Sequence, residues 1–176
     1  MIEPELPAEH VVDKETVRMS IALSYVKAWQ KLPPGPGDLL ASVLPVLASR
    51  DPGEDLAIKL SAEALGGKQP DANRKAWKGL KKTACAVHRA KVRHIWYRWN
   101  PETEREHRCF ADLVWATEIR VDPVQREIEL VFWPGLIEYL PLILGPIMEF
   151  KTRPPKADVA TDAIEGLTGY FYGRQG

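Results

Sequence analysis

The stretch DANRKAWKGLKKTACAVHRAKVRHIWYRW, residues 71–99, decides the fold of this chain. On a helical wheel its apolar and cationic side chains separate, which predicts an amphipathic helix over residues 71–90. The apolar stripe comprises Ala76, Trp77, Leu80, Ala84 and Val87, and the cationic side comprises Arg74, Lys75, Lys78, Lys81, Lys82 and Arg89. We expect Asp71 to cap this helix, because its carboxylate can accept hydrogen bonds from the first free N–H groups.

The period of the pattern changes directly after this helix. From Lys91 to Trp99 the side chains alternate, with Val92, His94 and Trp96 on one side, which predicts a strand. A basic amphipathic helix that runs straight into a strand is typical of a winged-helix DNA-binding unit. We therefore predict an α+β winged helix, a helix bundle with a small antiparallel β-meander.

Length and composition favour one packed globular domain. The chain has 176 residues, of which 45% are hydrophobic and 27% charged, as in ordinary globular proteins. No apolar run approaches the roughly 20 residues of a membrane span. The N-terminal residues 1–11 are expected to be frayed, and they lack the basic and apolar regions of a signal peptide. Two cysteines are too few for a disulfide framework, so we expect free thiols and a cytoplasmic location.

The formal charges sum to zero, but they are segregated along the chain. Residues 1–55 carry a net charge of −4, residues 56–98 a net charge of +9, and residues 99–176 a net charge of −5. From Lys68 to Arg98 one acid, Asp71, stands among ten basic residues. A focused positive patch can bind phosphates even on a neutral molecule, whereas the alternative is an ordinary solvated helix face. The segregation favours a phosphate-binding surface. Its eight candidate DNA-binding residues are Arg74, Lys75, Lys78, Lys81, Lys82, Arg89, Arg98 and Arg105.

The other elements follow from periodicity, caps and turn residues. Asp13 is expected to cap the first helix, with Val12 packing on Val17, and Pro33 to Gly37 to form a stiff loop. We predict helices over residues 13–31, 38–49 (kinked or cut at Pro45), 62–65 (capped by Ser61) and 135–144, and strands over 55–60 and 126–132. Residues 109–115 and 116–121 are also predicted to be extended, either as two strands or as one bent strand. The last predicted helix enters through Pro134 and ends near Gly145-Pro146.

Two stretches resemble the N-terminal winged-helix domain of the Rep-type replication initiators of iteron plasmids. EIRVDPVQREIELVFWPGLIEYLPLIL, residues 118–144, is similar to the family's strand, acidic turn, alternating strand ending in Phe, and Pro-initiated helix with a Tyr-Leu pair, here Tyr139-Leu140. The second is the basic helix, with Trp77 early, Leu80 behind it, and an Arg-containing passage into a strand. The resemblance covers residues 12–150.

The resemblance implies a first initiator domain that contacts the backbone of double-stranded plasmid-origin DNA and forms homodimers. It implies phosphate contacts by Lys78, Lys81, Lys82 and Arg89, joined by Arg98 or Arg105 near the wing. We expect binding by such a domain to be salt-sensitive and poorly sequence-specific, because phosphate contacts read no bases. The dimer surface is expected at the edges of the meander and on the N-terminal apolar helices, and host replication proteins are further candidate partners.

Domain boundaries follow from the same resemblance. Residues 1–150 form the predicted winged-helix domain, and only 26 residues follow Phe150, too few for another core. Residues 151–176 are therefore expected to be a C-terminal tail, or the start of a truncated second domain, with one short helix around residues 160–170.

Enzymatic and metal chemistry are disfavoured. Cys85 and His88 could join His107 and Cys109 around zinc, but this spacing fits no standard zinc motif. Cys85 has cationic neighbours that would lower a thiol pKa, but no base and orienting group accompany it. Trp77 and Trp115 have the phase of core residues, whereas Trp96 and Trp99, which flank Arg98, could be exposed. We expect no enzyme, metal or cofactor.

Two other functions remain open. A winged-helix transcriptional regulator would use the same helix but would prefer a defined palindrome. A protein-interaction module would dock the basic helix on an acidic partner. Steep salt dependence on random duplex favours the initiator domain, a sharp operator preference favours the regulator, and no duplex binding near physiological salt favours the interaction module.

Overall fold

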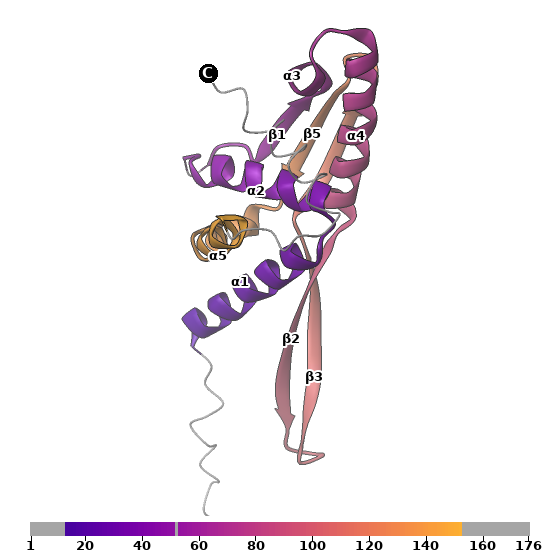
Figure 1. Ribbon diagram of the computed structural model, residues 1–176. Helices are drawn as coiled ribbons and strands as arrows, with labels where there is room; N and C mark the ends of the chain where they lie inside the picture. Colours follow the sequence, from indigo (N-terminus) through magenta and orange to yellow (C-terminus); the bar gives the residue numbers. More distant parts are fainter. Residues whose placement is uncertain (1–12, 52, 153–176) are drawn as a thin grey trace, which may run out of the picture.

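The protein has an α+β fold. The computed structural model describes residues 13–51 and 53–152, and Figure 1 shows the arrangement of the elements. The helices are α1 Lys14–Lys31, α2 Pro34–Ala48, α3 Ala62–Gly66, α4 Pro70–Arg89, the 3-10 helix η2 Pro134–Glu138 and α5 Leu140–Thr152. The strands are β1 Ala57–Ser61, β2 Lys91–Asn100, β3 Arg105–Val114, β4 Ala116–Asp122 and β5 Glu127–Phe132.

The strands form two separate antiparallel sheets. One has three strands in the order β1-β5-β4, and the other is the β2–β3 hairpin. The strands of the predicted β-meander are therefore divided between two sheets, and residues 109–114 and 116–121 belong to two strands rather than to one bent strand. Val114 pairs with Lys91 in the hairpin, whereas Ala116 pairs with Phe132 in the other sheet. The chain changes sheets at Trp115, which is fully buried and so anchors the crossing point.

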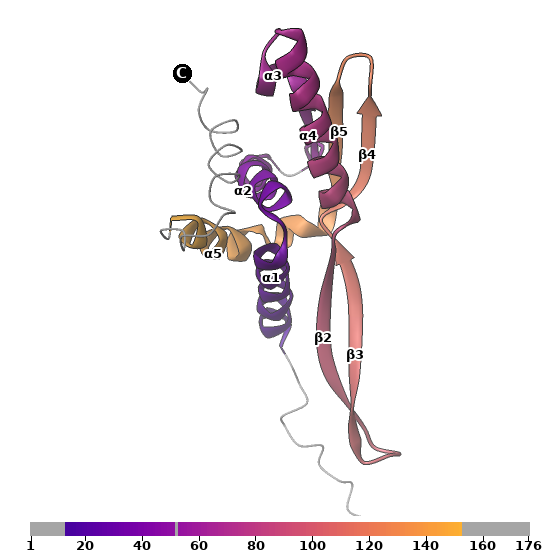
Figure 2. The same cartoon turned by 45° about the vertical axis from the view of Figure 1, so that its right-hand side comes forward.

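The core lies where the three-stranded sheet meets the helices. Ile128, Leu130 and Phe132 of β5 are fully buried, whereas the residues between them are half-buried. This alternation is the one that the sequence predicts. The helix α4 packs on β4 and β5, α2 contacts α4 and α5, and α1 contacts α5 and β2. Figures 1 and 2 show the hairpin extending away from this body. Among the described helices, none combines the length and apolar character needed to cross a membrane.

Several sequence-predicted ends are confirmed. The Asp13 side chain accepts a hydrogen bond from the Thr16 N–H at 2.7 Å, and the Ser61 hydroxyl accepts one from the Ala64 N–H at 3.1 Å. In the turn between β4 and β5, the Asp122 carboxylate accepts hydrogen bonds from the N–H groups of Val124 and Gln125. The expected frayed N-terminus, the packing of Val12, and the tail helix lie outside the described residues.

Three helix boundaries differ from the prediction, and a proline lies at each of them. They are the starts of α2 and α4 and the end of α5. Pro33 is the N-cap of α2 and Pro34 its first residue, so residues 34–37 are helix rather than loop. Proline suits a first helical turn, where its missing N–H has no partner to lose. The same preference puts Pro70 at the start of α4, so Gln69 is the N-cap, and Asp71 lies in the first turn without capping.

Prolines inside helices are also tolerated here. Pro45 lies within α2, which continues to Ala48, and α5 continues through Gly145 and Pro146 to Thr152. Pro146 cannot donate a backbone hydrogen bond. Burial offsets this loss, because Ile143 and Ile147, on either side of Pro146, are fully buried. The predicted end of α5 at Gly145-Pro146 is therefore wrong.

Candidate nucleic-acid interface

The helix pair α3–α4 is held close together at its turn. A Cβ at Gly66 would lie 2.6 Å from the Ala72 carbonyl oxygen, so only glycine fits this approach. Gly67 has a φ of +75°, which glycine adopts without strain. The Asn73 amide donates to the Gly67 carbonyl oxygen at 3.1 Å and accepts from the Arg126 guanidinium. This turn fixes the direction in which α4 leaves.

The apolar stripe of α4 faces the core as predicted. Leu80, Ala84 and Val87 are buried, and Ala76 and Trp77 are half-buried at its edge. These side chains pack on α2 and on the strands β4 and β5. Burial of each large aliphatic side chain contributes about 1.5–3 kcal/mol, so the orientation of α4 about its axis is strongly fixed. The opposite side of α4 must therefore face solvent.

That opposite side carries the cations. We call this surface the α4 face; its members are Arg74, Lys75, Lys78, Lys81, Lys82 and Arg89, and all six are exposed. Within the described parts of the chain, the salt bridges lie elsewhere and involve Arg18, Lys59, Lys68, Arg93 and Arg120. The cations of the α4 face are thus not neutralised by acids from other described elements.

The other two predicted DNA-binding arginines lie far from this face along the fold. Arg98 is opposite His107 and Arg105 is opposite Asn100, in the outer half of the β2–β3 hairpin. Figures 1 and 2 show that this end of the hairpin points away from α4. The structure brings six of the eight predicted residues together on α4 and places Arg98 and Arg105 on a separate arm.

The hairpin presents aromatic side chains to solvent. Tyr97 is 64% exposed, Phe110 56%, Trp99 42% and Trp96 41%. Because opposite residues of an antiparallel pair share a face, Tyr97, Trp99 and Phe110 lie on the same side, together with Arg108. We call this side the hairpin face. The Arg93 guanidinium lies 4.4 Å from the centre of the Phe110 ring.

The base of the hairpin is anchored to α1. The Tyr25 hydroxyl donates to the Val114 carbonyl oxygen at 2.9 Å, and the Ser24 hydroxyl lies 3.2 Å from Nδ1 of His94. His94 is only 7% exposed, and burial lowers the pKa of its imidazole below 6.5. Its ring also stacks on Trp96, with 5.6 Å between the ring centres. The inner hairpin is thus fixed while the outer half stays exposed.

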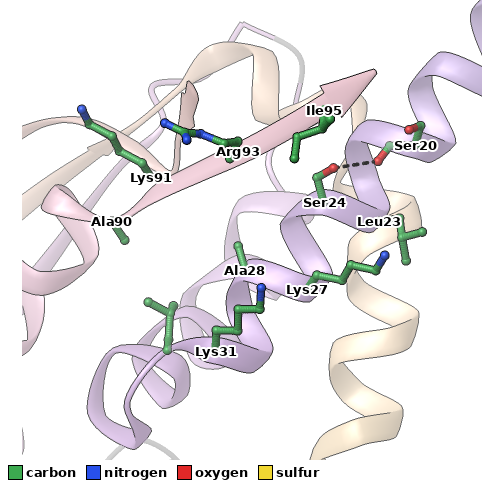
Figure 3. Close-up of a pocket in the computed structure, with 11 residues that line it drawn as sticks. Ser20, Leu23, Ser24, Lys27, Ala28, Lys31, Ala90, Lys91, Arg93 and Ile95 are labelled. Carbon is green, nitrogen blue, oxygen red and sulfur yellow. Dashed lines mark hydrogen bonds between the residues drawn. The ribbon is translucent and has the colours of Figure 1, made fainter. Parts of the chain in front are cut away.

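A groove lies beside this anchor, between α1 and β2. It has a volume of about 570 Å³ and is open to solvent (Figure 3). Its cationic lining residues are Lys27, Lys31, Lys91 and Arg93. Sequence analysis did not single out Lys27 or Lys31, because they belong to the stretch of residues 1–55, whose net charge is negative. We call this feature the α1–β2 groove.

The four residues considered for zinc fall on two elements. Cys85 and His88 lie in α4, whereas His107 and Cys109 lie in β3, with His107 in the outer half of the hairpin. Over residues 13–51 and 53–152, no group of three or more His, Cys, Asp or Glu side chains is placed to hold a metal ion. Both thiols are half-buried and free.

Comparison with known proteins finds similarity in the backbone fold but not in the sequence. No protein-family model matches the chain, and no curated protein is significantly similar to it. A solved structure with a similar backbone is the WH1 domain of MSBI1.176, a replication protein isolated from a multiple sclerosis patient. The likeness covers 72% of this chain and 93% of that chain, with 12% sequence identity and a TM-score of 0.47.

Proposed function

We propose that this protein is a replication-initiator-type winged-helix domain that binds double-stranded plasmid-origin DNA through the α4 face and forms homodimers. The observation that carries the proposal is the α4 face itself: six exposed cations, without an acidic partner among the described residues, on one side of a rigidly packed helix. In this role the protein is a cytoplasmic, non-enzymatic DNA-binding protein, and host replication proteins are candidate partners.

The arrangement of the cations supports contact with phosphates rather than with bases. Lys78, Lys81 and Lys82 follow one another around successive turns, so their ammonium groups are spread along one side of α4. Lysine is a flexible point charge, whereas reading of bases mostly uses bidentate arginine, asparagine or glutamine. We therefore expect affinity that falls steeply with salt and depends little on DNA sequence.

The hairpin face supports the homodimer part of the proposal. From His94 to Phe110 the chain carries three arginines and three glutamates, so this part has no net charge. Exposed aromatic side chains with balanced charges favour a second copy of the same surface over a polyanion. The hairpin face itself carries Arg108 and Glu106, opposite Tyr97 and Trp99, so in a two-fold dimer Arg108 of one hairpin could face Glu106 of the other.

A DNA titration with a matched charge control tests the proposal. In the triple variant Lys78→Ala/Lys81→Ala/Lys82→Ala we expect loss of most affinity for random duplex. The slope of log affinity against log salt should fall by about 2.7, because each lost phosphate contact removes about 0.9. The control Lys14→Ala/Lys59→Ala/Arg120→Ala removes the same charge from exposed sites outside α4 and should bind almost as well as wild type.

Folding and specificity complete the test. The triple variant should melt near the wild-type temperature in circular dichroism, because exposed surface changes usually alter stability by less than about 0.5 kcal/mol. In the same titration, Arg98→Ala/Arg105→Ala tests whether the hairpin arginines add phosphate contacts, with a slope loss of up to about 1.8. Undiminished binding by the α4 triple variant would overturn the proposal, and a sharp palindrome preference would favour a transcriptional regulator.

An acidic protein partner is the third possibility for the α4 face. Absence of duplex binding at physiological salt, with the wild-type protein folded, would favour this interaction module and contradict the initiator role. The positive charge of the α4 face would attract either DNA or an acidic protein. Only a binding titration therefore distinguishes these two ligands.

A further inference from the structure

The α1–β2 groove is formed by two elements that are far apart in the sequence. The helix α1 contributes residues from Ser20 to Lys31 at helical spacing, and β2 contributes Lys91, Arg93 and Ile95. Figure 3 shows these side chains on neighbouring ribbons, with Ser24 donating a hydrogen bond to the Ser20 carbonyl oxygen. The groove is therefore a product of the tertiary fold rather than of one sequence motif.

The lining of this groove is strongly one-sided in charge. Four of its eleven residues are cationic, and no Asp or Glu lines it. Arg93 is already paired, since its guanidinium donates to the Asp112 carboxylate at 2.8 and 3.1 Å. The pKa of this carboxyl is lowered mainly by its hydrogen bond with Arg93 and also by the charge of Lys91. Within the described parts of the chain no salt bridge includes Lys27 or Lys31. A concave surface of one sign focuses the field, which favours an anionic ligand.

The groove is continuous with the α4 face along the chain. Arg89 ends α4, Ala90 lines the groove, and Lys91 begins β2 and also lines it. Arg89 and Lys91 thus stand on either side of the joint between the α4 face and the groove. Figure 2 shows α4 above the region where α1 and β2 lie side by side. The groove is therefore the cationic surface that adjoins the C-terminal end of α4.

We propose that the α1–β2 groove binds the phosphate backbone of the same DNA duplex that occupies the α4 face. This inference rests on the proposed function, because it adds a second phosphate-contact site to the same ligand. A duplex carries negative charge along its whole length, so one molecule can meet both cationic surfaces. The helix α4, with 20 residues, spans roughly 30 Å, or about nine base pairs, and a longer duplex extends past its end.

Lys27 and Lys31 offer the cleanest test, because they lie on α1 and their substitution leaves α4 and β2 untouched. In Lys27→Gln/Lys31→Gln the salt slope for a 30-base-pair random duplex should fall by about 1.8, two contacts of about 0.9 each. The matched control Lys14→Gln/Lys59→Gln removes two exposed cations outside the groove and should keep the wild-type slope. Combined with the α4 triple variant, the losses of slope should add.

A structural role of the two lysines is separable from ligand contact. Lysines near the C-terminal end of a helix stabilise it through the helix dipole. The melting temperature of the double variant is therefore compared with that of the wild type by circular dichroism. Lysine acetylation provides a direct readout: in the wild-type protein, saturating duplex should protect Lys27 and Lys31 from the reagent, and should leave Lys14 reactive. Protection together with the loss of slope supports the groove as a phosphate site.

The possible failures point to different conclusions. An unchanged slope in the double variant, with the α4 triple variant impaired, overturns the groove and leaves the proposed function standing. Equal loss in Lys14→Gln/Lys59→Gln shows a general charge effect and also overturns the groove. If neither the double nor the triple variant alters DNA binding, both proposals fall.

Discussion

The α4 face and the β2–β3 hairpin are consecutive in the chain but have opposite surface chemistry. The helix α4 carries six exposed cations against one acid, and its apolar side chains are turned inward. The hairpin exposes four aromatic side chains and, from His94 to Phe110, balances three arginines with three glutamates. One surface suits a polyanion, and the other suits a protein surface of mixed charge.

The difference shows why local charge balance matters more than the number of arginines or lysines. Arg98 and Arg105 belong to the predicted DNA-binding set, but Glu102, Glu104 and Glu106 stand close to them in the sequence. Nearby acids reduce the potential that a phosphate meets, and salt screens what remains beyond about 8 Å. The cations of α4 have no such neighbours on their own helix except Asp71, so their potentials add.

The largest effect is expected at Trp115, where the chain passes from the hairpin to the sheet on which α4 packs. Trp115 is fully buried, and its ring lies edge-on to Tyr25 with 4.7 Å between the ring centres. Trp115→Ala should lower the free energy of unfolding by about 3–5 kcal/mol, because it leaves a large cavity. Urea unfolding measures this loss. Trp115→Phe is the control and should cost less, since it keeps much of the packing and removes an indole N–H that has no partner among the described residues. A loss below about 1 kcal/mol for Trp115→Ala would show that the two sheets are joined elsewhere.

An intermediate effect is expected from the hairpin face. In Tyr97→Ser/Phe110→Ser the dissociation constant of the proposed homodimer should rise about 30-fold or more, because a buried aromatic anchor contributes about 2 kcal/mol. Sedimentation equilibrium measures the constant. Val124→Ser is the control, since Val124 is 85% exposed on the turn between β4 and β5. A dimer as tight as wild type would move the interface away from the hairpin.

The smallest effect concerns pH and the buried base of the hairpin. Burial lowers the pKa of His94 below 6.5, so the folded state binds its proton less readily than the unfolded state. Stability should therefore fall as pH drops from 7.5 to 5.5, because the unfolded chain takes up the proton first. In His94→Gln this fall should be shallower, because the substitution removes the buried imidazole. Identical pH profiles for wild type and His94→Gln would contradict the role of His94.

Sequence reasoning succeeded where the decisive contacts are local. The positions of Leu80, Ala84 and Val87 fix the phase of α4, and the caps Asp13 and Ser61 act within three residues. Alternation in β5 also predicts its buried side. In these segments periodicity and capping suffice, because each residue is judged against neighbours in its own turn or strand.

It failed where distant partners decide. The residues around Trp115 do not indicate that the chain leaves one sheet there and enters another. This change depends on which distant strands pair, β2 with β3 and β5 with β4. The helices α2 and α5 continue through Pro45 and Pro146, where the sequence predicts a break, because burial of their apolar side chains stabilises them. Lys27 and Lys31 were overlooked because segment charge counts mix α1 with acidic loops, while the fold places these lysines beside Lys91.

One residue, Ala90, separates α4 from β2, and its N–H still donates to the Ala86 carbonyl oxygen at 3.0 Å. Such a joint leaves almost no slack, so a tilt imposed on the hairpin is passed to the C-terminal end of the helix. Self-association and DNA binding would then be thermodynamically linked. Whatever factor a partner subunit applies to DNA affinity, DNA must apply to subunit affinity in return.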